Sequence, residues 1–460
     1  MTESQGIDEL FACPRCDRTP LERAQSGYRC GGCKTAFPLV GEIPWLFAEP
    51  DASLGEWRNR LHFALKRHAH EAQRLQAELI GDDHPELTRR RLELAKTASE
   101  KHRQLLRNLL APIEMQALEA SYESHLALRT RLPADQGLDT YYANAHRDWC
   151  WGERENEASL AQLRRALGDP DEPALGDTLV LGAGAGRLAY DVHQALGCVR
   201  TVALDFNPLL LFIARDVVRG EQLQLWEFPL APRTLEDTAV LRTLAAPEVV
   251  RGGFNLVAGD VLRAPFAAGA FDAVLTPWLV DIVSEDYPVF AARVNRLLKP
   301  GGRWLNFGSL AFAHAERRRR YSAEEVVMLT EAAGFAAPEV VQADIPYMCS
   351  PASRNARVET VFTFAATKRD EVPAPARHKA LPDWIVTGKE PVPLLPSFRT
   401  QALSTQIYSF IMSLIDGRRS IEDMAKLLEQ QKLMTRQEAM PAIRHFLTKM
   451  YDDSQNQPGY

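Results

Sequence analysis

Three glycines at alternate positions, Gly182, Gly184 and Gly186, follow directly on a short apolar run. This run, residues 179–181, predicts a buried strand, and the apolar residues beyond the glycines recur on one face of a helix. Because glycine has no Cβ, it lets the backbone turn sharply and approach a ligand closely. The N-terminus of the following helix offers unpaired N–H groups to a polar or anionic group. The turn is therefore typical of a site for NAD, FAD or S-adenosylmethionine (SAM).

Acidic residues at the ends of later strands distinguish these cofactors. Asp205 ends a predicted strand 23 residues after Gly182, where a carboxylate can accept hydrogen bonds from ribose hydroxyls. The alternative for Asp205 is a helix cap. Asp260 ends the next predicted strand, and a Leu-Lys-Pro-Gly-Gly turn ends at Gly302. NAD explains only the glycines and Asp205, whereas SAM also uses Asp260 beside its adenine, so the series favours SAM.

Four of the seven cysteines form two C-x2-C pairs, Cys13 with Cys16 and Cys30 with Cys33. Four thiolates are the ligand set of tetrahedral structural zinc, and a closed set leaves no open position for catalysis. The spacer of thirteen residues is slightly short, so an iron–sulfur or vestigial site remains an alternative. Paired cysteines of this kind suit a reducing compartment, and we expect a cytoplasmic protein.

Composition excludes several classes of protein. The chain of 460 residues has 46% hydrophobic and 25% charged residues, which is ordinary for a globular protein of several domains. A net charge of −6 argues against a general phosphate-binding surface, such as a nucleic acid would need, and leaves a local basic patch as an alternative. No apolar run approaches the roughly 20 residues that span a bilayer. The polar, acidic N-terminus does not resemble a signal peptide, so we expect no membrane association.

The alternation of strands and helices predicts an α/β fold with a Rossmann-like core. The last two strands, residues 339–343 and 360–367, are expected to form a reversed, hairpin-like edge. A capping box at Ser322 predicts the start of the helix before them. Five segments are expected along the chain: a zinc ribbon (1–50), a helical region (51–140), the methyltransferase core (141–368), a proline-rich linker (369–397) and a small helical module (398–460).

Some stretches between these signals have weaker interpretations. Residues 226–252 contain three prolines and no clear period, which predicts an irregular insertion. His62, His68 and His70 lie close together, but the surrounding Arg and Glu residues favour a solvated helix face over a metal site. The run Arg317–Arg320 is interpreted as a solvated turn, and a clamp for an acidic or carboxylate-bearing substrate is the alternative.

The core also resembles a known family. Residues 144–368 resemble the carnosine N-methyltransferase family, whose members are class I SAM-dependent enzymes. The resemblance is carried by Arg147-Asp-Trp149, Gly182-Ala-Gly-x-Gly-Arg-Leu-Ala189, Ala258-Gly-Asp260, Asp272-x-Val-x-Thr276 and Leu298-Lys-Pro-Gly-Gly-x-Trp-x-Asn306-x-Gly308. It implies a cofactor lined by Asn144, Arg147, Gly182, Asp205, Asp260, Val261 and Pro277. Pro277 replaces a cysteine of the family and can offer only its carbonyl or its packing.

The same resemblance implies an acceptor site. Asp281 falls on the carboxylate that holds the imidazole of the family's dipeptide substrate, and a helix N-cap is the alternative. Trp278 could form an apolar wall beside it. His314 lies one residue from the register of the family's substrate histidine, with a polar loop residue as the alternative. A tyrosine of the family is missing around Val358-Glu359.

Both ends of the chain lie outside that resemblance. Residues 11–47 resemble the small zinc-ribbon activator subunits that partner methyltransferases acting on tRNA and release factors. The turn Leu414-Ile-Asp-Gly-x-x-Ser-Ile421 resembles a peptide-binding helical module of the pyrroloquinoline-quinone pathway. A packing module without a ligand is the alternative for this C-terminal segment.

Together these features predict a SAM-dependent N-methyltransferase with structural zinc. The expected acceptor is a histidine imidazole in a small molecule or a peptide, with Asp281 and His314 as catalytic residues. A second hypothesis is methylation of a protein or RNA docked through the ribbon and the C-terminal module. A third is a SAM-binding scaffold without catalysis.

Overall fold

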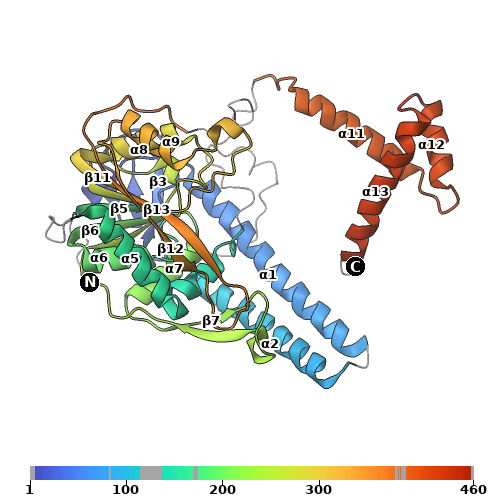
Figure 1. The fold of residues 1–460 in the computed structure, drawn as a ribbon, viewed down its shortest axis with the longest axis horizontal. Helices are drawn as coiled ribbons and strands as arrows, with labels where there is room; N and C mark the ends of the chain where they lie inside the picture. The colour runs from blue at the N-terminus through green and yellow to red at the C-terminus, as the bar shows by residue number, and fades with distance from the viewer. Residues whose placement is uncertain are drawn as a thin grey trace. The chain divides into compact units, whose positions relative to one another are not determined.

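Figure 1 shows a computed structural model of the chain. It describes residues 6–81, 84–113, 137–168, 175–378 and 390–456, together with residues 382 and 384. Part of the predicted helical region, residues 114–136, and part of the linker lie outside the described residues. The chain divides into two compact units, residues 1–382 and 383–460, which are described separately below.

The first unit is built on a seven-stranded sheet with the order β12-β13-β11-β10-β5-β6-β9. The five strands from β11 to β9 are parallel, and β13 runs antiparallel to both β11 and β12. This confirms the predicted Rossmann-like core with a reversed edge. The strands are β5 (Gly176–Leu181), β6 (Cys198–Asp205), β9 (Phe254–Ala258), β10 (Phe271–Pro277), β11 (Leu298–Gly308), β12 (Glu339–Tyr347) and β13 (Arg357–Thr367).

Alternate residues of the parallel strands pack into two different cores. In β5, Leu179 and Leu181 join a cluster with helix α8, while Val180 joins a cluster with helices α5 and α6. This follows from the period of two in a strand, and burial on both faces explains the continuous apolar runs. The flanking helices are α5 (Glu153–Leu167), α6 (Arg187–Ala195), α7 (Pro208–Val218), α8 (Tyr287–Leu297) and α9 (Ala323–Ala332). The predicted capping box of Ser322 with Glu325 is present at the start of α9.

The N-terminal ribbon docks against the rest of the unit. Its strands β1 (Glu22–Ala24), β2 (Gly27–Arg29), β3 (Ala36–Val40) and β4 (Ile43–Pro44) form an antiparallel sheet in sequence order. Directly after β4, Trp45 bridges Ala258 in parallel, and Leu46 N donates to Ala258 O at 2.7 Å. The ribbon therefore covers the edge strand β9, whose backbone groups would otherwise be open to another chain.

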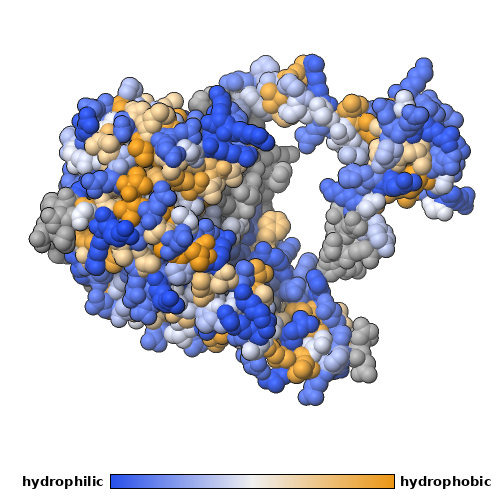
Figure 2. Space-filling view, in the orientation of Figure 1, coloured by the Kyte–Doolittle hydropathy of each residue, from blue (hydrophilic) through white to orange (hydrophobic). Residues whose placement is uncertain are grey.

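Two long helices follow the ribbon as a hairpin. They are α1 (Pro50–Gly81) and α2 (Glu86–Leu109), and Figure 1 shows them extending from the core. Hydrophobic and hydrophilic side chains mix on the visible face of the molecule in Figure 2. Phe63, Ile80 and Leu87 are exposed large hydrophobic residues of this hairpin. The chain re-enters the core through the short helix α4 (Tyr142–His146) and a π-helical turn, Arg147–Trp151.

The predicted irregular insertion contains regular structure, and that prediction is wrong. Strand β7 (Leu223–Glu227) pairs antiparallel with β8 (Val240–Leu244) in a separate two-stranded sheet. The prolines at 229 and 232 lie in the connection between these strands, where no ladder hydrogen bond is lost. Leu241 and Thr243 of β8 are exposed, so the strand has no strong alternation of hydrophobic residues.

The second unit has three helices around a small core. They are α11 (Pro396–Ser413), α12 (Ile421–Gln430) and α13 (Arg436–Asn456). Ile411, Met424, Leu428 and Ile443 are buried among them, and Ser420 caps α12 through a capping box with Asp423. Across the described helices of the whole chain, none combines the length and the apolar character needed to cross a bilayer.

Candidate functional site

The glycine turn after β5 has a backbone that only glycine adopts easily. Gly182, Gly184 and Gly186 have φ values of 72°, 59° and 88°. A Cβ on Gly182 would lie 3.0 Å from Leu279 Cδ1, and one on Gly186 would lie 3.1 Å from Ala214 Cβ. A Cβ on Gly184 would meet no protein atom within 4 Å. Gly184 is thus the glycine of the three that borders open space, where a ligand can approach.

Asp205 is held against this turn. Its Oδ2 accepts a hydrogen bond from Gly184 N at 2.8 Å, and its Oδ1 accepts one from Asn207 N at 2.8 Å. Asn207, not Asp205, caps helix α7, so the helix-cap alternative for Asp205 is wrong. The side chain is buried, and this burial raises the pKa of Asp205 to about 6. A buried acid next to a glycine turn can accept hydrogen bonds from a sugar.

Two other predicted cofactor residues follow neighbouring strands. Asp260 lies just after β9, and its Oδ1 accepts a hydrogen bond from Leu262 N at 2.9 Å, capping a 3-10 turn that begins at Val261. Burial raises the pKa of Asp260. Pro277 is the buried last residue of β10. Because β5, β6, β9 and β10 are parallel, these residues and the glycine turn all lie at the carboxyl edge of the sheet.

The segment before α5 is fastened to the glycine turn. Trp149 Nε1 donates to Ala185 O at 2.8 Å, and Arg187 NH1 donates to Asp148 O at 2.9 Å. Arg147 is in an ion pair with Asp148 at 2.7 Å and with Glu155 at 3.3 Å. These contacts place Arg147 close to the glycine turn.

Asn144, three residues earlier in α4, is half-buried.

Asp281 has one fixed carboxylate oxygen and one without a partner. The side chain is 8% exposed. Its Oδ2 accepts hydrogen bonds from Ser309 Oγ at 2.6 Å and from Ala311 N at 2.8 Å. Its Oδ1 is buried and accepts no hydrogen bond from any residue that the structure describes. The next helix, α8, has Asp286 at its N-cap, so the helix-cap alternative for Asp281 is wrong.

His314 lies in a loop that is held together by its own contacts. Glu316 N donates to His314 Nδ1 at 3.0 Å, and Arg319 NH1 lies 3.2 Å from His314 Nε2. No hydrogen bond between described residues joins His314 to Asp281. The arginine run from 317 to 320 is paired locally, since Arg318 lies 2.6 Å from Glu316. The residues beyond β11 that donate hydrogen bonds to Asp281 are Ser309 and Ala311, and the sequence singled out neither of them.

Tyr347 is a further residue that sequence reasoning missed. Its ring centroid lies 4.8 Å from that of Trp278 and 6.0 Å from the Arg147 guanidinium. In the β12–β13 register, Tyr347 stands opposite Arg357, next to the Val358-Glu359 stretch where a family tyrosine is missing. An aromatic ring therefore comes from the neighbouring strand. The predicted antiparallel edge was the signal that could have found it.

Trp278 itself has a φ of 48°, a strained value of the kind that gathers at functional sites.

Three histidines, His68 of α1, His102 of α2 and His146 of α4, form a cluster around Tyr142. His68 and His102 have ring centroids 4.8 Å apart, and Tyr142 lies 5.0 Å from His102 and 5.1 Å from His146. Among the described residues, His68 Nε2, His102 Nδ1 and both ring nitrogens of His146 are buried and have no hydrogen-bond partner. The prediction of a solvated helix face is wrong for His68, because its ring packs against His102 of α2 and against Phe228. It holds for His62 and His70, which are exposed.

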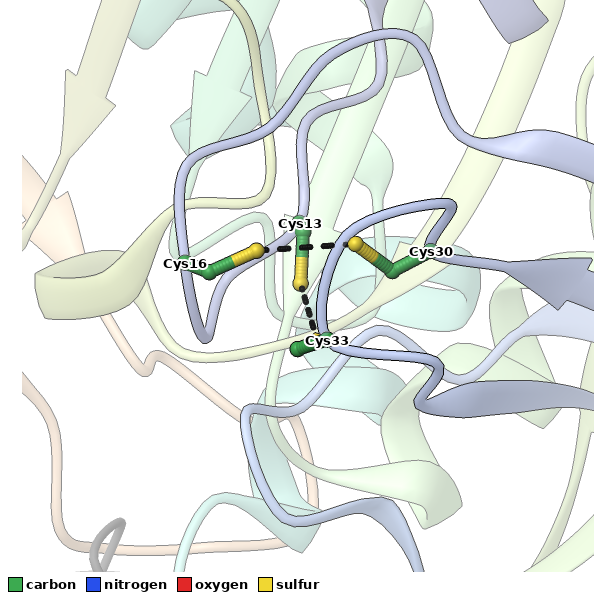
Figure 3. Close-up of side chains that lie close together, drawn as sticks. All are labelled: Cys13, Cys16, Cys30 and Cys33. Atoms are coloured by element: carbon green, nitrogen blue, oxygen red, sulfur yellow. Dashed lines mark hydrogen bonds between the residues drawn. The ribbon is translucent and has the colours of Figure 1, made fainter.

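The four knuckle cysteines converge, as Figure 3 shows. Their sulfur atoms all lie within 4.8 Å of one another, and the pairs Cys13–Cys33 and Cys16–Cys30 are 3.5 Å apart. A tetrahedral zinc with Zn–S bonds of about 2.3 Å sets its sulfurs about 3.8 Å apart. The four thiols therefore fit one zinc ion, and no fifth His, Cys, Asp or Glu joins the group among the described residues.

Comparison with known proteins agrees with this arrangement. The carnosine N-methyltransferase of Dictyostelium discoideum is 26% identical over 153 residues, covering 30% of this chain and 32% of the relative. That of Mus musculus is 25% identical over 184 residues, covering 36% of this chain and 45% of the relative. The chain thus spans less than half the length of these relatives.

Solved methyltransferase structures also match about half of the chain. A Haemonchus contortus phosphoethanolamine N-methyltransferase 2 with bound S-adenosylhomocysteine has a TM-score of 0.32 at 17% identity, covering 51% of this chain and 59% of that one. A possible histamine N-methyltransferase from Thermotoga maritima has a TM-score of 0.32 at 16% identity. This match covers 50% of this chain and 98% of that one. The family described as carnosine N-methyltransferase matches residues 139–369, half of the chain. The chain belongs to the carnosine N-methyltransferase family of SAM-dependent methyltransferases.

Proposed function

We propose that this chain transfers a methyl group from SAM to an imidazole nitrogen of a histidine in a small molecule or a peptide. The observation that carries the proposal is Asp281 Oδ1, which is buried and has no hydrogen-bond donor among the described residues. A buried carboxylate oxygen without a partner costs free energy unless a ligand supplies a donor. An imidazole N–H is such a donor, and the family relatives are named for carnosine, which contains a histidine.

Asp281 would act by orienting the acceptor. Its Oδ2 is already fixed by Ser309 and Ala311, so its Oδ1 has a defined direction. Accepting the N–H of one imidazole nitrogen leaves the lone pair of the other nitrogen free to take the methyl group. As that bond forms, the ring becomes cationic, and Asp281 can hold or accept the proton on the first nitrogen. SAM supplies the methyl group on a sulfonium centre, a good leaving group.

The cofactor would lie along the carboxyl edge of the sheet. The proposed cofactor residues are Asn144, Arg147, Gly182, Gly184, Gly186, Asp205, Asp260, Val261 and Pro277. The open space beside Gly184 and the buried carboxylate of Asp205 support the position of the amino-acid and ribose ends. Trp278 and Tyr347, with ring centroids 4.8 Å apart, would give the acceptor an aromatic wall that favours a flat, developing cation.

The four cysteines would hold one zinc ion with a structural role. This follows from the closed set of four thiols and the docking of the ribbon on β9. His314 is retained as a candidate acceptor-site residue only if the 309–320 loop rearranges, because its ring contacts are with Glu316 and Arg319.

A second candidate function is methylation of a protein or an RNA. It is favoured by the presence of a separate C-terminal unit, residues 383–460, since every residue named in the site above belongs to residues 1–382. The ribbon supports it less, because part of its surface is already buried against β9. Deleting residues 398–460 should abolish transfer if this function is right and leave small-acceptor transfer intact if the imidazole function is right.

The decisive experiment uses Asp281→Asn, which keeps the shape of the side chain but removes its charge. Transfer from labelled SAM to histidine-containing peptides should fall by on the order of a hundredfold, the usual scale for a positioned acid–base group. SAM affinity, measured by calorimetry, should barely change. Asp237→Asn, at a half-buried carboxylate in the 226–252 insertion, is the matched control. Undiminished peptide methylation by Asp281→Asn would disprove the imidazole proposal.

A further inference from the structure

A cavity of about 100 Å³ lies beside the first cysteine knuckle, within residues 1–382. It is bordered by the turn after β9, by helix α8 and by residues 374–377. One buried water needs roughly 10–15 Å³ by this measure, so the cavity has room for one tetrahedral oxyanion. Four arginines line it, Arg263, Arg293, Arg296 and Arg377, and the one carboxylate in the lining is Asp17.

Two of the four arginines are neutralised by carboxylates. Arg293 donates to both oxygens of Glu285, at 2.5 Å from Nε and 2.7 Å from NH2. Arg377 Nε donates to Asp17 Oδ2 at 2.6 Å. These two ion pairs use Asp17, which is the carboxylate of the lining, and Glu285, which precedes α8. They leave no carboxylate of the lining for the other two arginines.

Within the described residues, the remaining two guanidinium groups form no ion pair with a carboxylate. Arg263 is half-buried and donates only to backbone carbonyls there, from Nε to Pro14 O at 2.9 Å, from NH1 to His378 O at 3.0 Å, and from NH2 to Pro14 O and Arg15 O. Burial lowers the pKa of Arg263, with Arg377 and Arg293 acting in the same direction and Asp17 and Asp260 opposing. Within the described part of the chain, the Arg296 side chain makes no hydrogen bond or ion pair.

We propose that this cavity is an anion site that binds a phosphate group, either free or carried by a small phosphorylated molecule, through Arg296 and Arg263. Partly buried charges are stable when they are paired, and guanidinium groups match phosphate oxygens with two parallel hydrogen bonds. SAM carries no phosphate, and its carboxylate belongs to the amino-acid end that we place beside Gly184, which does not line this cavity. The inference does not depend on the identity of the methyl acceptor.

The test measures binding of inorganic phosphate to the full-length, metal-loaded protein by calorimetry, at matched ionic strength in chloride. Arg296→Gln should weaken phosphate binding at least tenfold, and Arg296→Lys, which keeps the charge, should weaken it less. Arg164→Gln, at an exposed arginine of α5, is the matched control and should bind phosphate as the parent does. Equal zinc content and equal melting temperature would show that the variants are folded.

A nucleoside monophosphate serves as a second probe. Tighter binding of this probe than of phosphate would indicate a phosphate carried by a larger ligand, and equal or weaker binding would indicate the free anion. Either result fits an anion site. The proposal is overturned if the parent shows no phosphate-specific binding, or if Arg296→Gln binds phosphate as tightly as the parent.

Discussion

The backbone N–H of Gly184 donates to the carboxylate of Asp205 at 2.8 Å, and this contact joins the ends of β5 and β6. It fixes one carboxylate oxygen and aligns the acid beside the open face of the glycine turn. Because burial raises the pKa of Asp205 to about 6, the charged form at neutral pH is under strain from desolvation. Hydrogen bonds from ribose hydroxyls would relieve that cost, which ties cofactor affinity to this pair.

Substitution at Gly184 should therefore abolish SAM binding. Gly184→Val places a side chain in the open space that the ligand would occupy, at a φ of 59°. Gly301→Val is a matched control, because Gly301 also has a positive φ, 76°, and open space around its Cβ position. Gly301 lies near the start of β11 (Leu298–Gly308) and not in the glycine turn. Calorimetry should detect no SAM binding to the first variant and parental affinity for the second. Retained affinity in folded Gly184→Val would count against the site.

Removing the hydroxyl of Ser309 should weaken catalysis without affecting the cofactor. Ser309→Ala deletes the 2.6 Å hydrogen bond that helps to orient Asp281. We expect kcat/KM for the imidazole acceptor to fall by about tenfold, because a misaligned anchor loses part of the positioning gain. Ser284→Ala, at an exposed serine after β10, should behave as the parent does. A Ser309→Ala enzyme with parental kinetics would show that Asp281 does not need this support.

The three buried histidines predict a loss of stability in acid. Burial lowers the pKa of His68 and His146 to about 4 and that of His102 to about 3, from an ordinary value of 6.5. Between the lowered pKa values of the folded protein and 6.5, the unfolded chain binds more protons than the folded one. The free energy of unfolding therefore falls as pH drops below 6.5. The expected slope approaches 1.4 kcal/mol per pH unit for each histidine. The charged groups near these rings are Arg67, Arg242, Glu227 and Asp139, whose Oδ2 lies 3.8 Å from His68 Nε2.

This slope can be measured by urea unfolding between pH 7 and pH 5. His102→Met removes one buried imidazole and should make the slope shallower. His62→Met, on the exposed face of α1, should keep the parental slope. Identical slopes for the two variants would show that the buried group does not control acid stability.

Loss of the metal should loosen the ribbon and uncover β9. Cys16→Ser should reduce zinc from about one per chain to near none, because three thiols no longer complete the tetrahedron. Cys349→Ser, at an exposed cysteine outside the cluster, should retain the metal. Hydrogen exchange should rise at the Leu46 amide in the first variant only, since that N–H then no longer donates to Ala258 O. Unchanged exchange would mean that the ribbon docks without its metal.

The elements that the sequence predicted correctly are those with local signals. The apolar runs of β5 and β6, the glycine turn and the Ser322 capping box each depend on neighbours along the chain. The residues that were missed depend on tertiary pairing. Ser309 reaches Asp281 because β10 and β11 are adjacent, and Tyr347 reaches Trp278 through the register of β12. His68 is half-buried because His102 of α2 and Phe228 pack against it, and no periodicity in α1 reveals these contacts.

The docking of the ribbon on β9 within one chain has a consequence for stoichiometry. A separate subunit would dissociate on dilution, whereas a tethered partner meets its surface at an effective concentration in the millimolar range. Each catalytic core therefore carries one ribbon at any protein concentration, including the nanomolar range of enzyme assays. Expression of this chain alone provides both halves of the Trp45–Ala258 contact in equal amounts.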